Sequence, residues 1–163
     1  MNTEPKDIIV LGAIQAGIKK FDKIQKITQI KPEELNSILE QMENREFIRV
    51  EDKNGFLGKK IEIVVSKKGS KEVDKQVLEL QTKWNQMSTF YKAQDKEKLK
   101  QYMDENRSFF PMMIFFGVMD MMMFSTMFSM IGMTMSNYVP PENIPEGEDR
   151  DTGEGEFDMD VGV

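Results

Sequence analysis

The chain has 163 residues, of which 39% are hydrophobic and 31% charged, and this length and balance fit one ordinary folded domain with appendages. It contains neither cysteine nor histidine, which excludes disulfide bonds, thiolate nucleophiles and imidazole bases or metal ligands. We therefore expect a protein without a catalytic site, a metal or a cofactor.

The head, residues 5–69, begins with three short amphipathic helical patterns. The first residues lack the basic-then-apolar order of a signal peptide, which predicts a cytoplasmic protein. Asp7 is the expected N-cap of the first helix, and Pro32 is expected in the first turn of the third. Apolar residues at steps of three and four predict the buried faces, which are Ile8, Leu11, Ile14 and Ile18, then Ile24 and Ile27, then Leu35, Ile38, Leu39 and Met42.

Two strand-like runs follow the third helix, and they read FIRV and KIEIVVS. In the second run Ile61, Ile63 and Val65 occupy alternate positions, as in a strand with one buried face. Between the runs lies Asn54-Gly55, which is the strongest short-range signal for a hairpin. The sequence therefore predicts a mainly α fold class with a small β-hairpin.

The stretch from the third helix onward resembles a known family. It reads LNSILEQMENREFIRVEDKNGFLGKKIEIVVSKKGSKEVDKQ, and it is similar to the third helix, the wing and the start of the fourth helix of MarR-like and PadR-like transcriptional regulators. Ile38-Leu39 through Phe47-Ile48 match the phrase that ends the family's third helix, and residues 65–69 match the phrase after its wing. The resemblance covers about residues 7–80 and implies a winged helix-turn-helix head.

In that family the third helix lies in the major groove of double-stranded DNA. Here this helix offers Asn36 and Gln41 to read adenine, and Ser37 to reach a base or a phosphate. The expected DNA-binding residues are Lys31, Asn36, Ser37, Gln41, Arg45, Lys53, Lys59 and Lys60.

The glutamates of the third helix keep a second interpretation open. Glu33, Glu34, Glu40 and Glu43 have the wrong sign for a groove lined by phosphates, because affinity there is mainly electrostatic. A docking mode led by the wing and the lysine-rich second helix avoids this repulsion. The alternative is a winged helix that docks on protein or RNA.

Residues 70–106 contain neither proline nor glycine, which predicts one long helix. Apolar residues spaced alternately by four and three follow the seam pattern of a coiled coil. This seam resembles the dimerisation helix of PadR-like regulators, and we expect a homodimer through Val73, Val77, Leu80, Trp84, Met87 and Tyr91. The alternative is that the helix folds back on the head as part of its core.

Residues 109–135 form an apolar segment in which methionine takes the place of leucine. Ten residues of 112–135 are methionine and none is leucine. The residues expected to contact a hydrophobic ligand or a membrane are Met112, Met113, Phe115, Phe116, Met119, Met123, Phe124, Met127 and Phe128.

Three interpretations of this segment remain open. A membrane span has enough length, but an acid such as Asp120 near its centre costs about 2.5–3.5 kcal/mol on insertion scales. A buried oligomer or domain core would break into two short helices near Ser125-Thr126, although cores use methionine sparingly. A groove for hydrophobic clients exploits the adaptable methionine side chains.

Residues 136–163 form an acidic tail, because charge is segregated along the chain. Residues 1–107 carry a net charge of +3, and residues 108–163 carry −9. Prolines, glycines and acids dominate the tail, which predicts disorder. Its end, EFDMDVGV, alternates apolar residues with acids and glycine, so residues 156–163 suit strand addition to a protein partner or a groove. The alternative is a solubilising tail.

The sequence leads to two functional hypotheses. The first is a non-enzymatic, homodimeric DNA-binding transcriptional regulator, in which segment 109–135 binds an effector, supports the oligomer or tethers the protein to a membrane. The second is an adaptor or chaperone-like factor, whose head docks on protein or RNA and whose methionine segment binds hydrophobic clients or a membrane.

Overall fold

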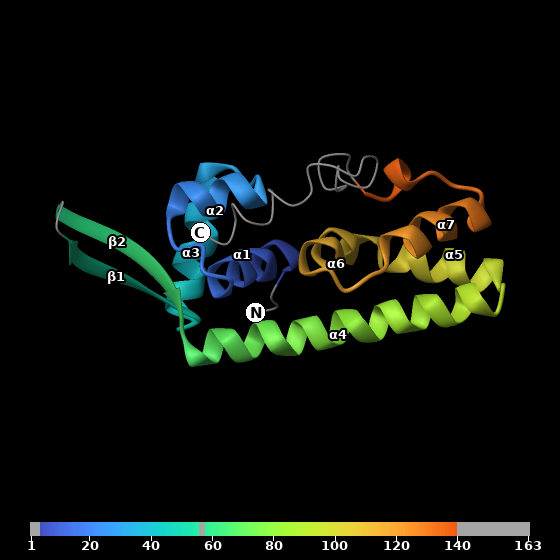
Figure 1. Ribbon diagram of the computed structural model, residues 1–163, viewed down its shortest axis with the longest axis horizontal. Helices are drawn as coiled ribbons and strands as arrows, with labels where there is room; N and C mark the ends of the chain where they lie inside the picture. The colour runs from blue at the N-terminus through green and yellow to red at the C-terminus, as the bar shows by residue number, and fades with distance from the viewer. Residues whose placement is uncertain (1–3, 56–57, 140–163) are drawn as a thin grey trace. The chain divides into compact units, whose positions relative to one another are not determined.

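The computed structural model describes residues 4–55 and 58–139, which are mainly helical with one two-stranded antiparallel sheet (Figure 1). The mainly α fold class with a small β-hairpin is therefore confirmed. The elements are α1 Pro5–Gln15, α2 Phe21–Thr28, α3 Pro32–Asn44, β1 Ile48–Gly55, β2 Gly58–Val65, α4 Lys67–Lys92, α5 Lys96–Glu105, η1 Arg107–Phe109, α6 Phe110–Phe116, α7 Met121–Ile131 and η2 Met135–Asn137.

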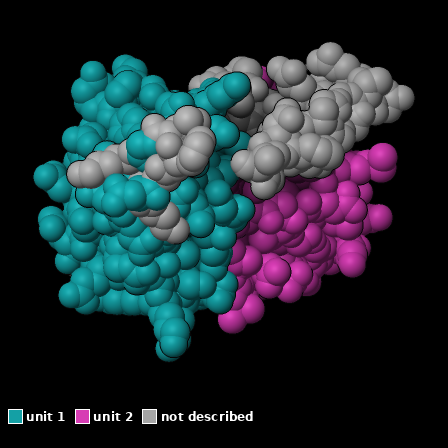
Figure 2. All heavy atoms as spheres, turned by 60° about the vertical axis from the view of Figure 1, so that its left-hand side comes forward, with its two compact units in different colours: residues 1–75, 153–163 teal, residues 76–152 magenta. Residues whose placement is uncertain are grey.

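The chain divides into two compact units, which Figure 2 colours separately. Among the described residues, unit 1 comprises those up to Lys75 and unit 2 comprises those from Gln76 to Val139. The division falls within α4, so the N-terminal turns of this helix belong to unit 1.

Unit 1 is a three-helix head with a hairpin, and it buries the apolar positions predicted between Ile8 and Met42 except Ile27, which is half-buried. Helix α1 contacts α2, α3 and β2, and α3 buries Leu35, Ile38, Leu39 and Met42 while its other side is exposed. The N-cap of α1 is Glu4 instead of the expected Asp7. Asp7 lies one turn into the helix, where its Oδ2 accepts a hydrogen bond from the Glu4 amide at 3.1 Å, and burial raises its pKa.

Three close backbone contacts position the hairpin and the start of α4 within unit 1. The amide of Ile63 donates to the Lys19 carbonyl at 2.9 Å, and the Ser66 amide donates to the Phe47 carbonyl at 2.9 Å. At the start of α4, Gly69 lies so close to the end of α3 that a Cβ there would collide with the Phe47 carbonyl oxygen. Gly69 is thus required because the two backbone segments lie too close together for a side chain.

The single long helix expected over residues 70–106 is instead two helices. Helix α4 ends at Lys92, because Gln94 adopts a left-handed conformation with φ 58° and the Asp95 amide bonds the Phe90 carbonyl. Asp95 then caps α5, with its side chain accepting a hydrogen bond from the Lys98 amide at 3.2 Å. Neither residue type breaks a helix by itself, so the absence of proline and glycine was misleading here.

The methionine segment forms two short helices in unit 2, and their break differs from the expected position near Ser125-Thr126. Helix α6 ends at Gly117, which has the left-handed φ of 66° typical of a C-cap. Asp120 caps α7, because its side chain accepts a hydrogen bond from the Met123 amide at 3.1 Å. The acid that made a membrane span costly thus has a structural role at a helix start.

The core of unit 2 is built from sulfur-containing and aromatic side chains. Phe124 is central to it, with its ring centroid 5.1 Å from that of Phe110, 4.8 Å from that of Phe128 and 6.4 Å from that of Trp84. The aromatic pairs are edge-to-face, an arrangement that suits the ring quadrupoles. The fully buried members of this core include Leu80, Met87, Leu99, Met103, Phe110, Met113, Phe124 and Met127.

The acidic tail, expected to begin at residue 136, starts later than its composition indicates. Tyr138 and Val139 are buried, and the Tyr138 hydroxyl donates a 2.5 Å hydrogen bond to Asp104 Oδ1. This hydrogen bond is the main cause of the lowered pKa of Asp104, and Lys100 and Arg107 lower it further. Burial and the same bond raise the pKa of Tyr138 to about 12. The prediction of disorder for residues 140–163 lies outside the described residues.

Candidate nucleic-acid interface

Helices α2 and α3 are joined by a tight turn. Gln29 caps α2 with a left-handed φ of 59°, and its amide bonds the Gln25 carbonyl at 2.7 Å. Ile30 is buried beneath the turn, and Pro32 opens α3 three residues after Gln29, where its fixed φ suits the first helical position. The two helices are therefore held at a defined angle by short-range geometry.

The outer face of α3 presents the expected base-reading residues to solvent. Asn36, Ser37 and Gln41 are all exposed, whereas their neighbours Leu35 and Ile38 are buried. The amphipathic pattern thus orients α3 with its amide and hydroxyl side chains outward. These groups have the chemistry that reads base edges.

A cluster of lysines lies on the α2 side of this face, and we call it the α2 lysine cluster. It consists of Lys19, Lys20, Lys23, Lys26 and Lys31, all exposed. Lys26 and Lys31 also line an open groove of about 450 Å³ at the α2–α3 turn, together with Gln25 and Gln29. Of these lysines only Lys31 is among the DNA-binding residues expected from the sequence, which also predicted a docking mode led by the lysine-rich second helix.

The hairpin carries three of the expected DNA-binding residues, Lys53, Lys59 and Lys60. Lys60 is exposed, but Arg49 forms an ion pair with Glu51 at 3.2 Å. Arg45, expected to contact DNA, is half-buried with its guanidinium carbon 4.7 Å from the centre of the Phe47 ring. The side chains of Lys53 and Lys59 lie outside the described part of the structure.

Negative charge on α3 opposes the binding of phosphates. Glu33, Glu40 and Glu43 are exposed along the same helix as the base-reading residues. Glu34 is partly neutralised, because its Oε2 lies 3.0 Å from the Lys6 Nζ. Since surface ion pairs are weak, this contact offsets only part of the repulsion.

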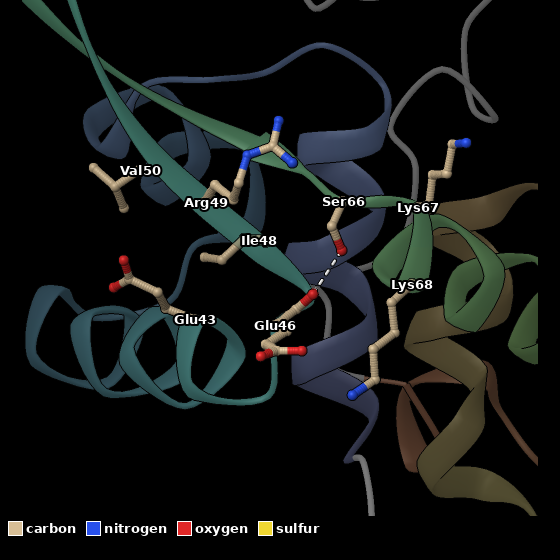
Figure 3. Close-up of a pocket in the computed structure, with 8 residues that line it drawn as sticks. All are labelled: Glu43, Glu46, Ile48, Arg49, Val50, Ser66, Lys67 and Lys68. Atoms are coloured by element: carbon tan, nitrogen blue, oxygen red, sulfur yellow. Dashed lines mark hydrogen bonds between the residues drawn. The ribbon is translucent and has the colours of Figure 1, made fainter.

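A second groove, which we call the wing groove, lies at the base of the hairpin and was not anticipated from the sequence. It has a volume of about 660 Å³ and is lined by Glu43, Glu46, Ile48, Arg49, Val50, Ser66, Lys67 and Lys68 (Figure 3). The Ser66 hydroxyl donates to the Glu46 carbonyl at 2.6 Å and accepts from the Gly69 amide at 3.0 Å, so it fixes one end of the groove. A serine directly after a strand and directly before a helix was the available signal.

The residues expected to bind a hydrophobic ligand or membrane lie on α6, α7 and the turn between them. Six of them are buried, namely Met112, Met113, Met119, Phe124, Met127 and Phe128. Phe115, Phe116 and Met123 are half-buried. Over residues 4–55 and 58–139, no helix has the length and apolar character needed to cross a membrane. In the described structure the segment contributes to the core of unit 2.

The expected dimerisation seam divides into two sets along α4. Val73, Leu80 and Met87, which are spaced by seven residues, are buried within the single chain. Val77, Trp84 and Tyr91 form the other set, and each is half-buried. A second chain that packed against α4 would therefore contact Val77, Trp84 and Tyr91.

No cluster of three or more potential metal ligands occurs within the described residues. Comparison of the chain with protein-family models, with curated proteins and with solved structures gives no match. The candidate nucleic-acid interface therefore rests on the geometry and charge of the described residues alone.

Proposed function

We propose that the chain is a non-enzymatic DNA-binding regulator of the winged-helix class that acts as a homodimer. The observation that carries this proposal is the juxtaposition of the tight α2–α3 turn, the exposed amides of α3 and the α2 lysine cluster. Phosphate contacts position a protein on the duplex, and base contacts specify the sequence. The cluster supplies the first kind of contact, and Asn36, Ser37 and Gln41 supply the second.

The glutamates of α3 determine the docking mode of this proposal. A helix that bears Glu33, Glu40 and Glu43 is repelled when it lies deep in a phosphate-lined groove. The protein therefore approaches the duplex on the α2 side, with Lys23 and Lys26 against one backbone. The start of α3 enters the groove at a shallow angle, and the exposed Lys60 of the wing contacts the flanking backbone.

The test measures DNA binding by the full-length chain, with fluorescence anisotropy as the readout over a salt series. Five lysine–phosphate contacts predict a slope of log affinity against log salt of about −4.5, since each contact contributes about −0.9. The double variant K23E/K26E should reduce the slope by about 2 and weaken binding at every sequence. The matched control is K92E/K96E, which reverses two exposed lysines of unit 2. Absence of binding at low salt, or equal effects of the two variants, would contradict the proposal.

The exposed glutamates favour a second candidate, an adaptor whose head docks on a basic protein surface. In this case Glu33 and Glu40 are contact residues, and the α2 lysine cluster is an ordinary solvated surface. The variant E33Q/E40Q separates the two candidates, because it removes repulsion from DNA but also removes attraction to a basic partner. Tighter DNA binding by E33Q/E40Q supports the regulator, whereas no DNA binding by either form favours the adaptor.

A further inference from the structure

The outer edge of β1 presents unpaired backbone groups at known positions. Hydrogen bonding alternates along an antiparallel strand pair. Phe47 faces its partner strand, because its carbonyl accepts from the Ser66 amide, and Ile63 faces outward, because its amide bonds Lys19. With the register Val50 opposite Ile63, the N–H and C=O groups of Ile48, Val50 and Asp52 point away from β2. In the described residues no further strand covers this edge.

The side chains along this edge have an apolar face and a charged face. Ile48, Val50 and Ile61 share one face of the hairpin by alternation. Val50 is 47% exposed and Ile61 is 63% exposed, so the apolar face continues beyond the part that unit 1 buries. Figure 3 shows Arg49 directed away from Val50, while Glu43 lies on the side of Val50. An added strand is therefore favoured when it is apolar on the face beside Val50.

We propose that residues 156–163 of the same chain, EFDMDVGV, add to β1 as a third strand and fill the wing groove. Phe157, Met159 and Val161 recur with the period of two that a strand requires, and Glu156, Asp158 and Asp160 alternate with them. Main-chain bonds supply the affinity of such an addition, and the alternate side chains supply its specificity.

Apolar contact fixes which way the added strand faces. With its apolar side chains beside Ile48 and Val50, its acids lie on the face that carries Arg49 and Lys60 together with Glu51 and Glu62. The reverse orientation would bring the acids toward Glu43 and would expose the apolar residues. Lys67 and Lys68, which also line the wing groove, make its end attractive to an acidic segment.

A long connection joins the proposed strand to the described part of the chain. Residues 140–155 separate the last described residue from the proposed strand, and when extended they span up to about 50 Å. A tether that reaches its site gives the attached segment a high effective concentration there. The inference is independent of nucleic-acid binding, because it uses an edge and a groove outside the α2 lysine cluster.

Disulfide trapping in the full-length chain tests the contact, because the protein has no cysteine of its own. The pair V50C/M159C places two thiols on neighbouring strands, where Cα atoms about 5.5 Å apart suit a disulfide. V50C/F157C and V50C/V161C cover adjacent registers. The matched controls are R49C/M159C, which uses the opposite face, and V50C/G153C, which uses the same tail outside the segment.

We expect one apolar pair to oxidise about tenfold faster than either control, with the product migrating as a single chain. Equal rates for the apolar pairs and the controls would overturn the strand addition. A disulfide-linked dimer as the main product would overturn the assignment to the same chain.

Amide hydrogen exchange gives a second readout that requires no crosslink. The change Met159→Pro removes a ladder donor, whereas Met159→Leu keeps both the donor and the apolar side chain. In the full-length protein, exchange at the Ile48, Val50 and Asp52 amides should become about tenfold faster in M159P and stay unchanged in M159L. Identical exchange in M159P and the wild type would refute the proposal, and neither variant alters a residue of the described fold.

Discussion

At the residue scale, the absence of a side chain at Gly69 allows α4 to pack closely against the Phe47 backbone just before β1. A Cβ at this position would collide with the Phe47 carbonyl, and it would also lie 2.9 Å from the Val65 Cγ2. An alanine normally stabilises a helix by about 1 kcal/mol relative to glycine. Here the collision involves backbone, which cannot rotate away, so we expect the steric cost to exceed this gain.

We therefore predict that Gly69→Ala lowers the free energy of unfolding by about 1–3 kcal/mol, the usual cost of overpacking. The measurement is urea denaturation of the full-length chain. The control is Lys71→Ala, which lies two residues on and is exposed. An unchanged or raised stability of G69A would show that α4 and the end of α3 separate easily.

The Tyr138–Asp104 hydrogen bond makes stability depend on pH in a defined direction. Its acceptor has a lowered pKa in the folded state, so the ionised form is favoured by folding. The stabilisation is therefore fully present above the ordinary carboxyl pKa of about 3.9 and is lost as the pH falls through the lowered value. At the alkaline end, the Tyr138 pKa of about 12 exceeds the ordinary value of about 10, so the stabilisation declines between these two values.

We predict that Tyr138→Phe costs about 1 kcal/mol at pH 7, since the Asp104 side chain is 38% exposed and the bond is partly screened. The difference between Y138F and the wild type should shrink below pH 4, as measured by urea denaturation at a series of pH values. Tyr91→Phe serves as the control, because Tyr91 is only half-buried. A difference that does not change with pH would argue against a charged acceptor.

At the element scale, Asp120 determines where the methionine segment becomes two helices. Its side chain satisfies the Met123 amide at the start of α7, where the first helical N–H groups lack partners within the helix. We predict that Asp120→Ala lowers the free energy of unfolding by about 1 kcal/mol. Asp120→Asn should retain most of this stabilisation, because asparagine is also a good N-cap. Thermal unfolding followed by the fluorescence of Trp84, the only tryptophan, measures the effect in unit 2. Equal loss in both variants would mean that charge, and not capping, is the contribution.

The comparison of α3 with the α4–α5 region shows what sequence periodicity predicts and what it misses. The four apolar positions expected on α3 are all buried, because an amphipathic stripe specifies its own burial direction. The turn at Gln94 was missed, because glutamine is not a residue type that commonly adopts the left-handed conformation found there. For α6 and α7 the local signals, Gly117 and Asp120, were present, but hydropathy alone cannot separate a core from a span. The wing groove depends on residues from α3, β1 and α4, which only the fold brings together.

At the scale of the whole molecule, the proposed homodimer has a reduced set of contact residues. Val73, Leu80 and Met87 are already buried in the single chain, so a coiled-coil partner has Val77, Trp84 and Tyr91 available. We predict that Val77→Lys weakens dimerisation about tenfold or more, since it inserts a charge into the seam. Sedimentation over a concentration series measures the association. The comparison variant is Leu78→Lys, which alters a neighbouring residue that is 64% exposed outside the seam.

A wild-type chain that sediments as a monomer at every concentration would remove the homodimer from the proposed function. In contrast, a dimer that withstands V77K and dissociates in L78K would move the interface to another face of α4. Either outcome leaves the described core of unit 2 unchanged, because Val77 is only half-buried and Leu78 is exposed.

The methionine-rich core of unit 2 makes the protein sensitive to oxidation whenever this core opens. Thioethers are oxidised by peroxide to sulfoxides, which are polar and disrupt apolar packing. Met122 is 78% exposed and is therefore modified first, whereas Met87, Met103, Met113 and Met127 are fully buried and react only in molecules whose core has opened. Each sulfoxide formed there prevents reclosure, so damage accumulates with every opening. The composition that makes this core adaptable also makes the lifetime of the folded unit depend on the oxidant around it.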